Sequence, residues 1–336
     1  MAALAAVVAT AGCVKPSETS LNDANKQYLE SWIQLYHPDA KVTADGMYIL
    51  EEEEGSGAAL NDFKSYPYIR LDYETRNLAG KITDYTSEKI AKQLGDYAVS
   101  DFYGPKIWYC GEYNLPVGVE NALSTMKAGG SKTVLIPGWL LTTPTNKNKK
   151  PIRYKDFDDY FKKESGTNLI YTLRPVERID DITKWEIDSL VTWMGHNYPA
   201  VSPADSLKRG FYFVNLKDGA DTKEWPTDTT FKINYIGRLL NGTVFDTNVR
   251  DTAKFYDIYN ASSKYEPVSI AFAEEYKDIK MSGSGVVDGF AYLISQMHSG
   301  QKARGIFYSG WGYGSKENGN TIPPYSPLIF DVEIIR

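Results

Sequence analysis

Two sets of apolar residues follow the spacing i, i+3, i+4 and i+7, which is the spacing of one helix face. The sets are Leu29, Trp32, Ile33 and Tyr36, and then Ile187, Leu190, Val191 and Met194. After each set, apolar and polar residues alternate, which predicts strands that are buried on one side. These strand segments contain Ile69, Leu71 and Tyr73 in the first case and Phe231, Ile233 and Tyr235 in the second. The pattern therefore predicts two copies of one unit.

Other parts of the unit also recur. Each copy has a helical segment that begins with Gly and ends with Met and Gly, at 118–129 and 289–300, and closes on an apolar strand, at 169–171 and 328–330. We expect an α+β fold in which each copy is a twisted antiparallel sheet wrapped on a short helix, preceded by one amphipathic helix. The expected domains are residues 21–180 and 181–336.

Long polar stretches interrupt both copies, at 142–167 and 249–284. We interpret them as functional or mobile loops and not as core, because structureless loops of this length are uncommon inside compact domains.

The composition is that of a soluble globular protein with room for two domains. The chain has 336 residues, of which 42% are hydrophobic and 24% charged, so it is neither disordered nor membrane-spanning as a whole. A net charge of -6 argues against a nucleic-acid partner. The basic run Lys147–Lys150 is interpreted as a solvated loop.

Residues 1–12 carry no charge and are mostly Ala, Val and Leu, which suits the core of a secretion signal. The sequence Thr10-Ala11-Gly12-Cys13 resembles the lipobox of bacterial lipoproteins. That resemblance implies a signal peptide over 1–12, a lipidated Cys13, a tether over 13–20 and an extracytoplasmic protein anchored to a bacterial membrane. Thr10 stands where Leu is usual, and no Lys or Arg precedes the apolar run. The alternative is an apolar N-terminus with an incidental Cys.

The second cysteine, Cys110, follows an apolar run, so we expect it to be buried and inert. The three histidines are scattered without metal-ligand spacing, and no phosphate-binding loop or nucleophile elbow is present. The acidic run Glu51–Glu54 is interpreted as a solvated strand edge, with a calcium site as the alternative. We therefore expect neither a metal nor a cofactor.

An ordered series of motifs runs from residue 210 to the C-terminus. The motifs are Asn234-Tyr235-Ile236-Gly237, Asn241-Gly242-Thr243-Val244-Phe245-Asp246, Val286-Val287-Asp288-Gly289-Phe290, Met297-His298-Ser299-Gly300-Gln301-Lys302-Ala303, Gly312-Tyr313-Gly314, Ile322-Pro323-Pro324 and Leu328-Ile329-Phe330-Asp331-Val332-Glu333. As a set they resemble an FKBP-type peptidyl-prolyl cis-trans isomerase (immunophilin). The resemblance implies a five- or six-stranded antiparallel sheet around the helix near 290–297, with the active pocket between them.

The resemblance also assigns roles to residues. The residues implied to line the proline pocket are Tyr235, Phe245, Val287, Phe290 and Phe330. Val286 is expected at the rim, Ile322 over the mouth, and Asp246 as a buried polar side chain. The backbone N–H of Val287 and the hydroxyl of Tyr313 are expected to bind substrate carbonyls.

Two features depart from the compact members of the family. Phe290 stands where many members have Trp, which we expect to loosen the pocket floor. The stretch 249–284 is longer, and its residues Tyr256, Tyr259 and Tyr265 are expected to rim the pocket as additional polypeptide-binding surface.

The first copy resembles the family only faintly. Tyr73 matches Tyr235 and Asp84 matches Asp246, but Thr83 replaces the pocket Phe. Pro116 and Val119 stand where the second copy has Val287 and Phe290. The first copy is interpreted as a degenerate FKBP-like domain, either structural or peptide-binding.

The resemblance thus favours a prolyl isomerase that acts on exported polypeptides and needs no dedicated acid, base or nucleophile. Two alternatives stay open. The first is a catalytically silent binding or chaperone module that uses the same pocket, and the second is a purely structural surface lipoprotein.

Overall fold

The structure is a computed structural model that describes residues 21–111, 114–141, 167–202, 206–219 and 229–335. The expected signal peptide, Cys13 and the tether lie outside the described residues, as does the run Lys147–Lys150. We refer to residues 21–180 as the first domain and to residues 181–336 as the second domain.

The first domain is built around a sheet of seven strands in the order β1-β2-β6-β7-β3-β4, with β5 also paired to β3. Its elements are α1 (Leu21–Tyr36), β1 (Lys41–Val42), β2 (Tyr48–Glu53), β3 (Tyr68–Asn77), β4 (Ile82–Tyr85), α2 (Glu88–Leu94), β5 (Lys106–Tyr109), α3 (Val117–Ser124), β6 (Ser131–Ile136), η1 (Gly138–Leu140) and β7 (Leu169–Ile179).

The second domain is built around a sheet of eight strands in the order β13-β12-β11-β9-β15-β14-β8, with β10 also paired to β9. Its elements are α5 (Ile182–Asn197), β8 (Phe211–Lys217), β9 (Thr230–Leu239), β10 (Val244–Thr247), α6 (Arg250–Phe255), β11 (Val268–Ala271), η3 (Tyr276–Asp278), β12 (Lys280–Met281), β13 (Ser284–Gly285), α7 (Asp288–Ser295), β14 (Lys302–Phe307), η4 (Ser309–Trp311) and β15 (Leu328–Ile335).

The two sheets share one topology, which confirms the predicted α+β repeat. The path β2-β6-β7-β3 with β4 and β5 beside β3 corresponds to β8-β14-β15-β9 with β10 and β11 beside β9. All of these pairs are antiparallel. The second sheet exceeds the expected five or six strands because the short β12–β13 hairpin extends it beyond β11.

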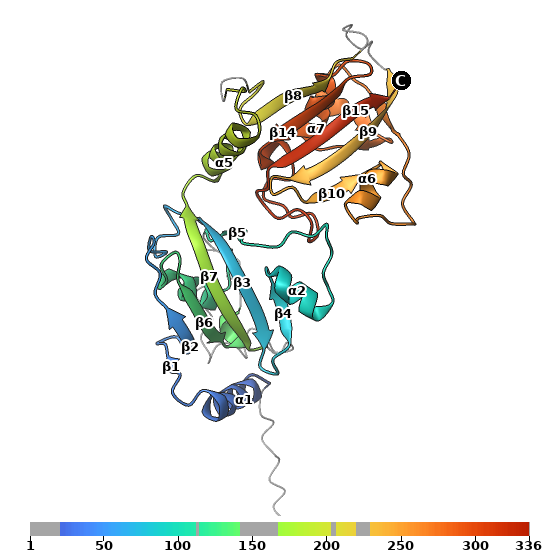
Figure 1. The fold of residues 1–336 in the computed structure, drawn as a ribbon. Coiled ribbons are helices and arrows are strands. Elements are labelled where there is room, and N and C mark those ends of the chain that lie inside the picture. Colours follow the sequence, from blue (N-terminus) through green and yellow to red (C-terminus); the bar gives the residue numbers. More distant parts are fainter. Residues whose placement is uncertain (1–20, 112–113, 142–166, 203–205, 220–228, 336) are drawn as a thin grey trace, which may run out of the picture.

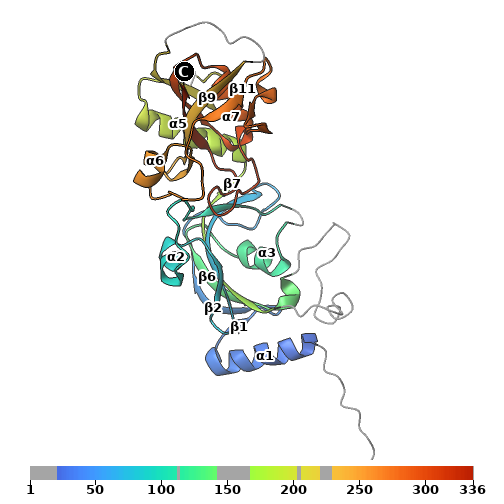
Figure 2. The same ribbon diagram turned by 90° about the vertical axis from the view of Figure 1, so that its right-hand side faces the viewer.

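Each sheet has a helix on both faces. The short helices α3 and α7 pack on the inner faces, where the largest buried clusters lie. The amphipathic helices α1 and α5 cover the outer faces through separate clusters, which include Leu29 and Ile33 on α1 and Leu190 and Met194 on α5. Figures 1 and 2 show α1 beneath the first sheet and α5 beside β8 and β14.

The register of this helix repeat differs from the sequence interpretation by three residues. Trp32 donates its indole N–H to the Leu78 carbonyl at 3.0 Å, and Trp193 makes the same bond to Leu240 at 3.0 Å. Trp193 is therefore the counterpart of Trp32, although the helical spacing alone placed Leu190 there. Tyr36 was also expected on the buried face but is 61% exposed, since the helix ends there and the chain turns away.

The stretch 249–284 is not the open loop that its polarity predicted. It forms α6, β11, η3, β12 and β13, and β11 is a full partner of β9. Ile270 and Ile279 are buried in the inner core, because alternating apolar residues within the stretch complete the sheet. Tyr259 stacks on Tyr265 with ring centroids 5.2 Å apart, so these two rings pack on each other.

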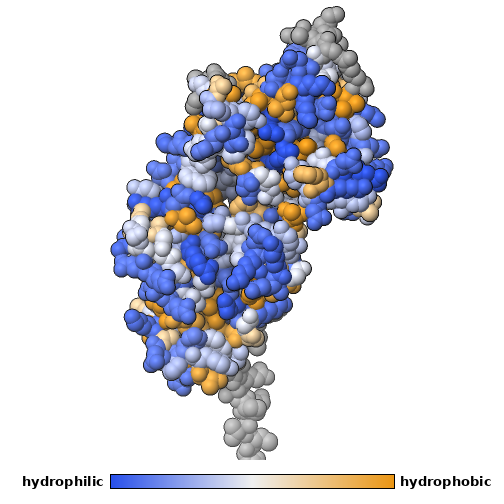
Figure 3. Space-filling model, in the orientation of Figure 1, coloured by the Kyte–Doolittle hydropathy of each residue, from blue (hydrophilic) through white to orange (hydrophobic). Residues whose placement is uncertain are grey.

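The two domains are stacked end to end, and β7 leads almost directly into α5 (Figure 1). The loop 312–327 of the second domain reaches down to β5 of the first, and the Phe102 N–H donates to the Asn320 carbonyl at 2.9 Å. Figure 3 shows a largely hydrophilic face with apolar patches on both domains and at their junction. Within the described residues, no helix has both the length and the apolar character of a membrane span.

Candidate active site

The aromatic residues predicted for the pocket converge between α7 and the inner face of the second sheet. Phe290 of α7 lies with its ring centroid 5.0 Å from Phe330 of β15 and 5.8 Å from Tyr235 of β9. Phe245 of β10 meets Phe330 edge-on at 5.6 Å. The alternation of β9 and β15 makes this possible, because every second side chain points to the inner face.

Helix α7 begins at the motif Val286-Val287-Asp288, which contains the residue predicted for the rim of the pocket, Val286. Val287 is its N-cap in extended conformation, and its carbonyl accepts from the Phe290 and Ala291 N–H groups. No described residue accepts a hydrogen bond from the Val287 N–H. Val286 and Val287 are half-buried. A donor at a half-buried helix start is available to an incoming carbonyl.

Gly237 makes room for Phe245. A Cβ on Gly237 would lie 2.4 Å from the Phe245 ring and 3.0 Å from that of Phe330. Gly289 similarly allows α7 to approach the Phe307 ring, which would lie 2.5 Å from an added Cβ. Glycine at these two positions is a packing requirement, because any side chain would displace an aromatic ring.

Tyr235 carries the polar group at the end of this aromatic set. Its hydroxyl donates to Asp246 at 2.7 Å. Burial raises the pKa of Tyr235 above its ordinary value, and the nearby Asp246 carboxylate and Tyr313 phenol raise it further. The phenol therefore remains protonated at neutral pH, and Tyr313 lies close to it.

The predicted burial of Asp246 is wrong, because the residue is exposed. It lies on the short edge strand β10, beside the bulge between Val244 and Asp246. Its carboxylate therefore accepts from Tyr235 while remaining open to solvent. The next two residues, Thr247 and Asn248, are buried instead. Asn248 accepts from the Tyr235 backbone N–H at 2.7 Å and donates to the Ile233 carbonyl at 2.9 Å.

The loop after β14 places Tyr313 and Ile322 over the aromatic set. It starts with η4, where the Ser309 N–H and hydroxyl donate to Glu186 of α5 at 3.0 and 2.8 Å. Glu186 is buried, and burial raises its pKa to about 7, although the bonds from Ser309 favour its charged form. No pattern in the sequence predicted this contact, because Glu186 has the spacing of an ordinary polar residue on a helix.

Phe102 of the first domain also belongs to this region, and the sequence did not predict it. Its ring packs against the inner core cluster of the second domain, to which Ile322 and Phe330 belong. Ile322 is only 1% exposed and Phe290 only 3%. Phe290 and Ile322 are therefore shielded from solvent, and Phe102 of the first domain packs against the same core cluster.

A buried ion cluster supports the opposite face of the sheet. Asp331 lies between Arg238 and Arg304, with Arg238 Nη1 at 2.5 Å and Arg304 Nη2 at 2.8 Å from its Oδ2. Burial alone would raise the pKa of Asp331, but the hydrogen bonds and charges of Arg304 and Arg238 outweigh it and hold the pKa below its ordinary value. These bonds fix β9, β14 and β15 beneath the aromatic set.

Comparison with known proteins agrees with this geometry. Residues 222–335 match the family model described as FKBP-type peptidyl-prolyl cis-trans isomerase. These residues belong to that family. The FKBP-type segment contains all nine residues predicted for the site, from Tyr235 to Phe330.

The relatives that match cover a similar part of the chain. The macrophage infectivity potentiator of Trypanosoma cruzi is 28% identical over 39% of this chain and 55% of its own length. The FKBP-type 22 kDa peptidyl-prolyl cis-trans isomerase of Escherichia coli K12 is 26% identical over 39% of this chain and 52% of its own length. The chain thus spans about half the length of these two relatives. A crystal structure of the three FKBP domains of wheat FKBP73 aligns over 87% of this chain and 94% of its own, at 16% identity and a TM-score of 0.29.

The first domain repeats part of the FKBP-type site. Tyr73 donates to Asp84 at 2.9 Å, and Thr86 accepts from the Tyr73 backbone N–H at 3.0 Å, as Asn248 does in the second domain. Thr75 and Thr83 share a hydrogen bond at 2.8 Å where the FKBP-type segment has Gly237 and Phe245. The aromatic wall is therefore missing at this point, as the sequence predicted.

Other sequence predictions in the first domain also have an outcome. Cys110 is buried, as expected, and burial raises its pKa to about 12. In the acidic run, Glu52 pairs with the buried Lys132 at 2.9 Å and Glu54 with Lys127 at 2.5 Å. These two carboxylates thus have lysine partners.

Proposed function

We propose that the protein is a peptidyl-prolyl cis-trans isomerase whose active site lies in the second domain. The observation that carries this proposal is the convergence of Tyr235, Phe290 and Phe330 in one dry aromatic cluster within the FKBP-type segment. The substrates are proline-containing segments of unfolded or exported polypeptides.

The chemistry requires no covalent step. Rotation about a prolyl bond is limited by the loss of amide resonance, with a barrier of about 18–20 kcal/mol. The twisted imide has less charge separation than the planar one, so a dry aromatic pocket stabilises it relative to the ground state. The Val287 N–H and the Tyr313 hydroxyl each bind a substrate carbonyl, and the bond from Tyr313 holds its carbonyl while the chain beyond the proline rotates. Each ~1.4 kcal/mol of such differential stabilisation gives about a tenfold rate increase.

The test uses the full chain in a refolding assay that is limited by proline isomerisation. Tyr313→Phe and Asp246→Ala each remove one hydrogen-bonding group, and we expect kcat/KM to fall about tenfold. Asp84→Ala is the matched control, because it removes the equivalent tyrosine–aspartate bond from the first domain, and Tyr28→Phe controls for loss of an exposed phenol. No acceleration by the unmodified chain would refute catalysis and leave only binding.

A catalytically silent polypeptide-binding module is the second candidate. The exposed rings of the stretch 249–284 favour it, since Phe255 is 81% exposed and Tyr259 37%. Phe255→Ser combined with a short Gly-Ser link in place of residues 256–265 removes both exposed rings, and it keeps β11 and the Glu266 carbonyl to which Asn248 donates at 3.0 Å. We expect this change to reduce action on an unfolded protein more than on a short peptide, and equal loss on both would contradict a binding role for the stretch.

We also propose that the protein is lipid-anchored at Cys13 on the extracytoplasmic side of a bacterial membrane. The support is the resemblance of residues 10–13 to a lipobox. Mass spectrometry of the mature N-terminus should detect an acylated Cys13, and an unmodified Met1 with a free thiol at Cys13 would contradict it.

A further inference from the structure

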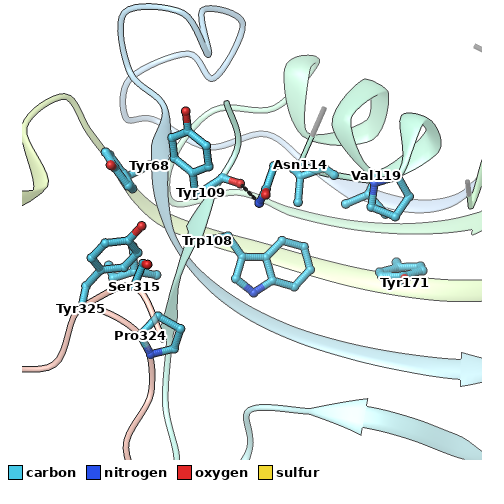
Figure 4. A pocket seen from close by; sticks show the side chains of 12 residues that line it. Tyr68, Trp108, Tyr109, Asn114, Val119, Tyr171, Ser315, Pro324 and Tyr325 are labelled. Carbon is cyan, nitrogen blue, oxygen red and sulfur yellow. Dashed lines mark hydrogen bonds between the residues drawn. The ribbon is translucent and has the colours of Figure 1, made fainter. Parts of the chain in front are cut away.

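The first domain contains a cavity of about 610 Å³ on the inner face of its sheet. Trp108 of β5, Pro116 and Val119 at the start of α3, and Tyr171 of β7 line it. Figure 4 shows the Trp108 indole at its centre, with Tyr171 and Val119 on one side. Specific ligand pockets in proteins typically have volumes of about 300–1,000 Å³, so the space suits a short peptide segment.

This cavity occupies the position that the isomerase site has in the second domain. Pro116 is the N-cap of α3 as Val287 is the N-cap of α7. Tyr171 of β7 pairs with Thr75 of β3, and in the second domain Phe330 of β15 pairs with Gly237 of β9 in the same way. Tyr171 is therefore the counterpart of Phe330. Val119 stands in the place of the larger Phe290, which leaves more space above the sheet.

The second domain already places a proline and an aromatic ring at the edge of this cavity. Pro324 and Tyr325, from the loop that also carries Ile322, border it. Tyr325 meets Tyr68 edge-on with ring centroids 5.3 Å apart, and it has a positive φ of 56°. Burial and the neighbouring Tyr68 raise the pKa of Tyr325 to about 12. This contact indicates that the cavity accommodates a peptide segment in which a proline stands beside an aromatic residue. Such a segment packs against the tyrosines and the tryptophan that line the cavity.

We propose that this cavity is a second polypeptide-binding site. It holds a proline-aromatic segment of a client polypeptide next to Pro324 without isomerising the prolyl bond. The flat faces of Trp108 and Tyr171 suit a proline ring. The Thr75–Thr83 pair replaces the aromatic wall of the isomerase site, so the cleft binds without enclosing the prolyl bond. A client held in both clefts gains effective concentration at the catalytic one.

The test counts binding events on the full chain with acetyl-Ala-Leu-Pro-Phe-amide by isothermal titration calorimetry. We expect two events, and Asn114→Trp, which places an indole at the cavity from an exposed position, should remove one. The matched control is Asn197→Trp, because both asparagine amides donate to a backbone carbonyl, at 2.7 Å and 2.9 Å, and Asn197 lies on α5 away from the cavity. The peptide with Ala in place of Pro should lose both events, because both sites are proposed to bind a proline.

A second measurement does not depend on how the variants fold. The same peptide carrying a photoreactive diazirine is crosslinked to the unmodified chain and the adducts are mapped by mass spectrometry. We expect adducts within 106–119 or at Tyr171 in addition to those in the second domain. The absence of any binding event that Asn114→Trp removes from folded protein, or adducts confined to the second domain, would overturn the proposal. Because these readouts measure binding alone, they stand whether or not the second domain proves catalytic.

Discussion

Glu186→Gln tests how one buried carboxyl sets the pH dependence of stability in the second domain. The pKa of Glu186 rises from 4.5 to about 7 on burial. The folded state therefore binds the proton more tightly than the unfolded state. This contribution to stability is fully present below about pH 4.5 and is lost as the pH rises through 7, and it amounts to about 3 kcal/mol at 1.36 kcal/mol per pKa unit. Glutamine keeps the shape and an acceptor for Ser309 but cannot ionise.

Urea unfolding of the full chain, followed between about pH 5 and pH 8, measures this term. We expect the unmodified protein to lose about 2.5 kcal/mol relative to the Gln variant across that interval. Glu88→Gln is the control, since Glu88 forms an exposed pair with Lys92 on α2 that contributes about 0.5 kcal/mol or less. Parallel stability curves for the unmodified protein and Glu186→Gln would refute the reasoning.

Two further changes test the packing and the charges around the aromatic set. Gly237→Ala should displace the Phe245 ring, because the new Cβ would lie 2.4 Å from it. We expect kcat/KM for isomerisation to fall at least about tenfold. Gly285→Ala is the control and should leave the rate unchanged, because no atom lies within 4 Å of its new Cβ. Asp331→Asn should destabilise the second domain by about 3–5 kcal/mol in urea unfolding, since two arginines then lack their buried partner, whereas Glu333→Gln, whose carboxylate is 3.9 Å from a lysine, should cost about 1 kcal/mol or less.

The repeat and the aromatic site were predictable because their signals are local. Alternation on β9 and β15 places Tyr235 and Phe330 on one face, and the order of the motifs places Phe290 opposite them. The same reasoning failed for the register of α5. Helical spacing is satisfied by the set Ile187, Leu190, Val191 and Met194, but spacing alone does not show which residue corresponds to Trp32. That residue is Trp193, which is identified by its hydrogen bond to the Leu240 carbonyl.

Long-range contacts were beyond the reach of the sequence. Phe102 packs against the second domain although more than a hundred residues separate it from its partner Asn320. The buried Glu186 likewise accepts a hydrogen bond from Ser309, which lies more than a hundred residues further along the chain. No periodicity or motif encodes such contacts. The exposure of Asp246 was missed for a related reason, since it depends on β10 lying at the sheet edge.

The direct passage from β7 into α5 has a practical consequence for dissecting the protein. The family match begins at residue 222, after α5 and β8. A fragment that begins there would lack Phe211, whose side chain is completely buried. It would also lack α5, so the outer face of β14 and β15 would be exposed to solvent. The smallest autonomous piece should therefore begin near residue 181, and shorter expression fragments are expected to aggregate.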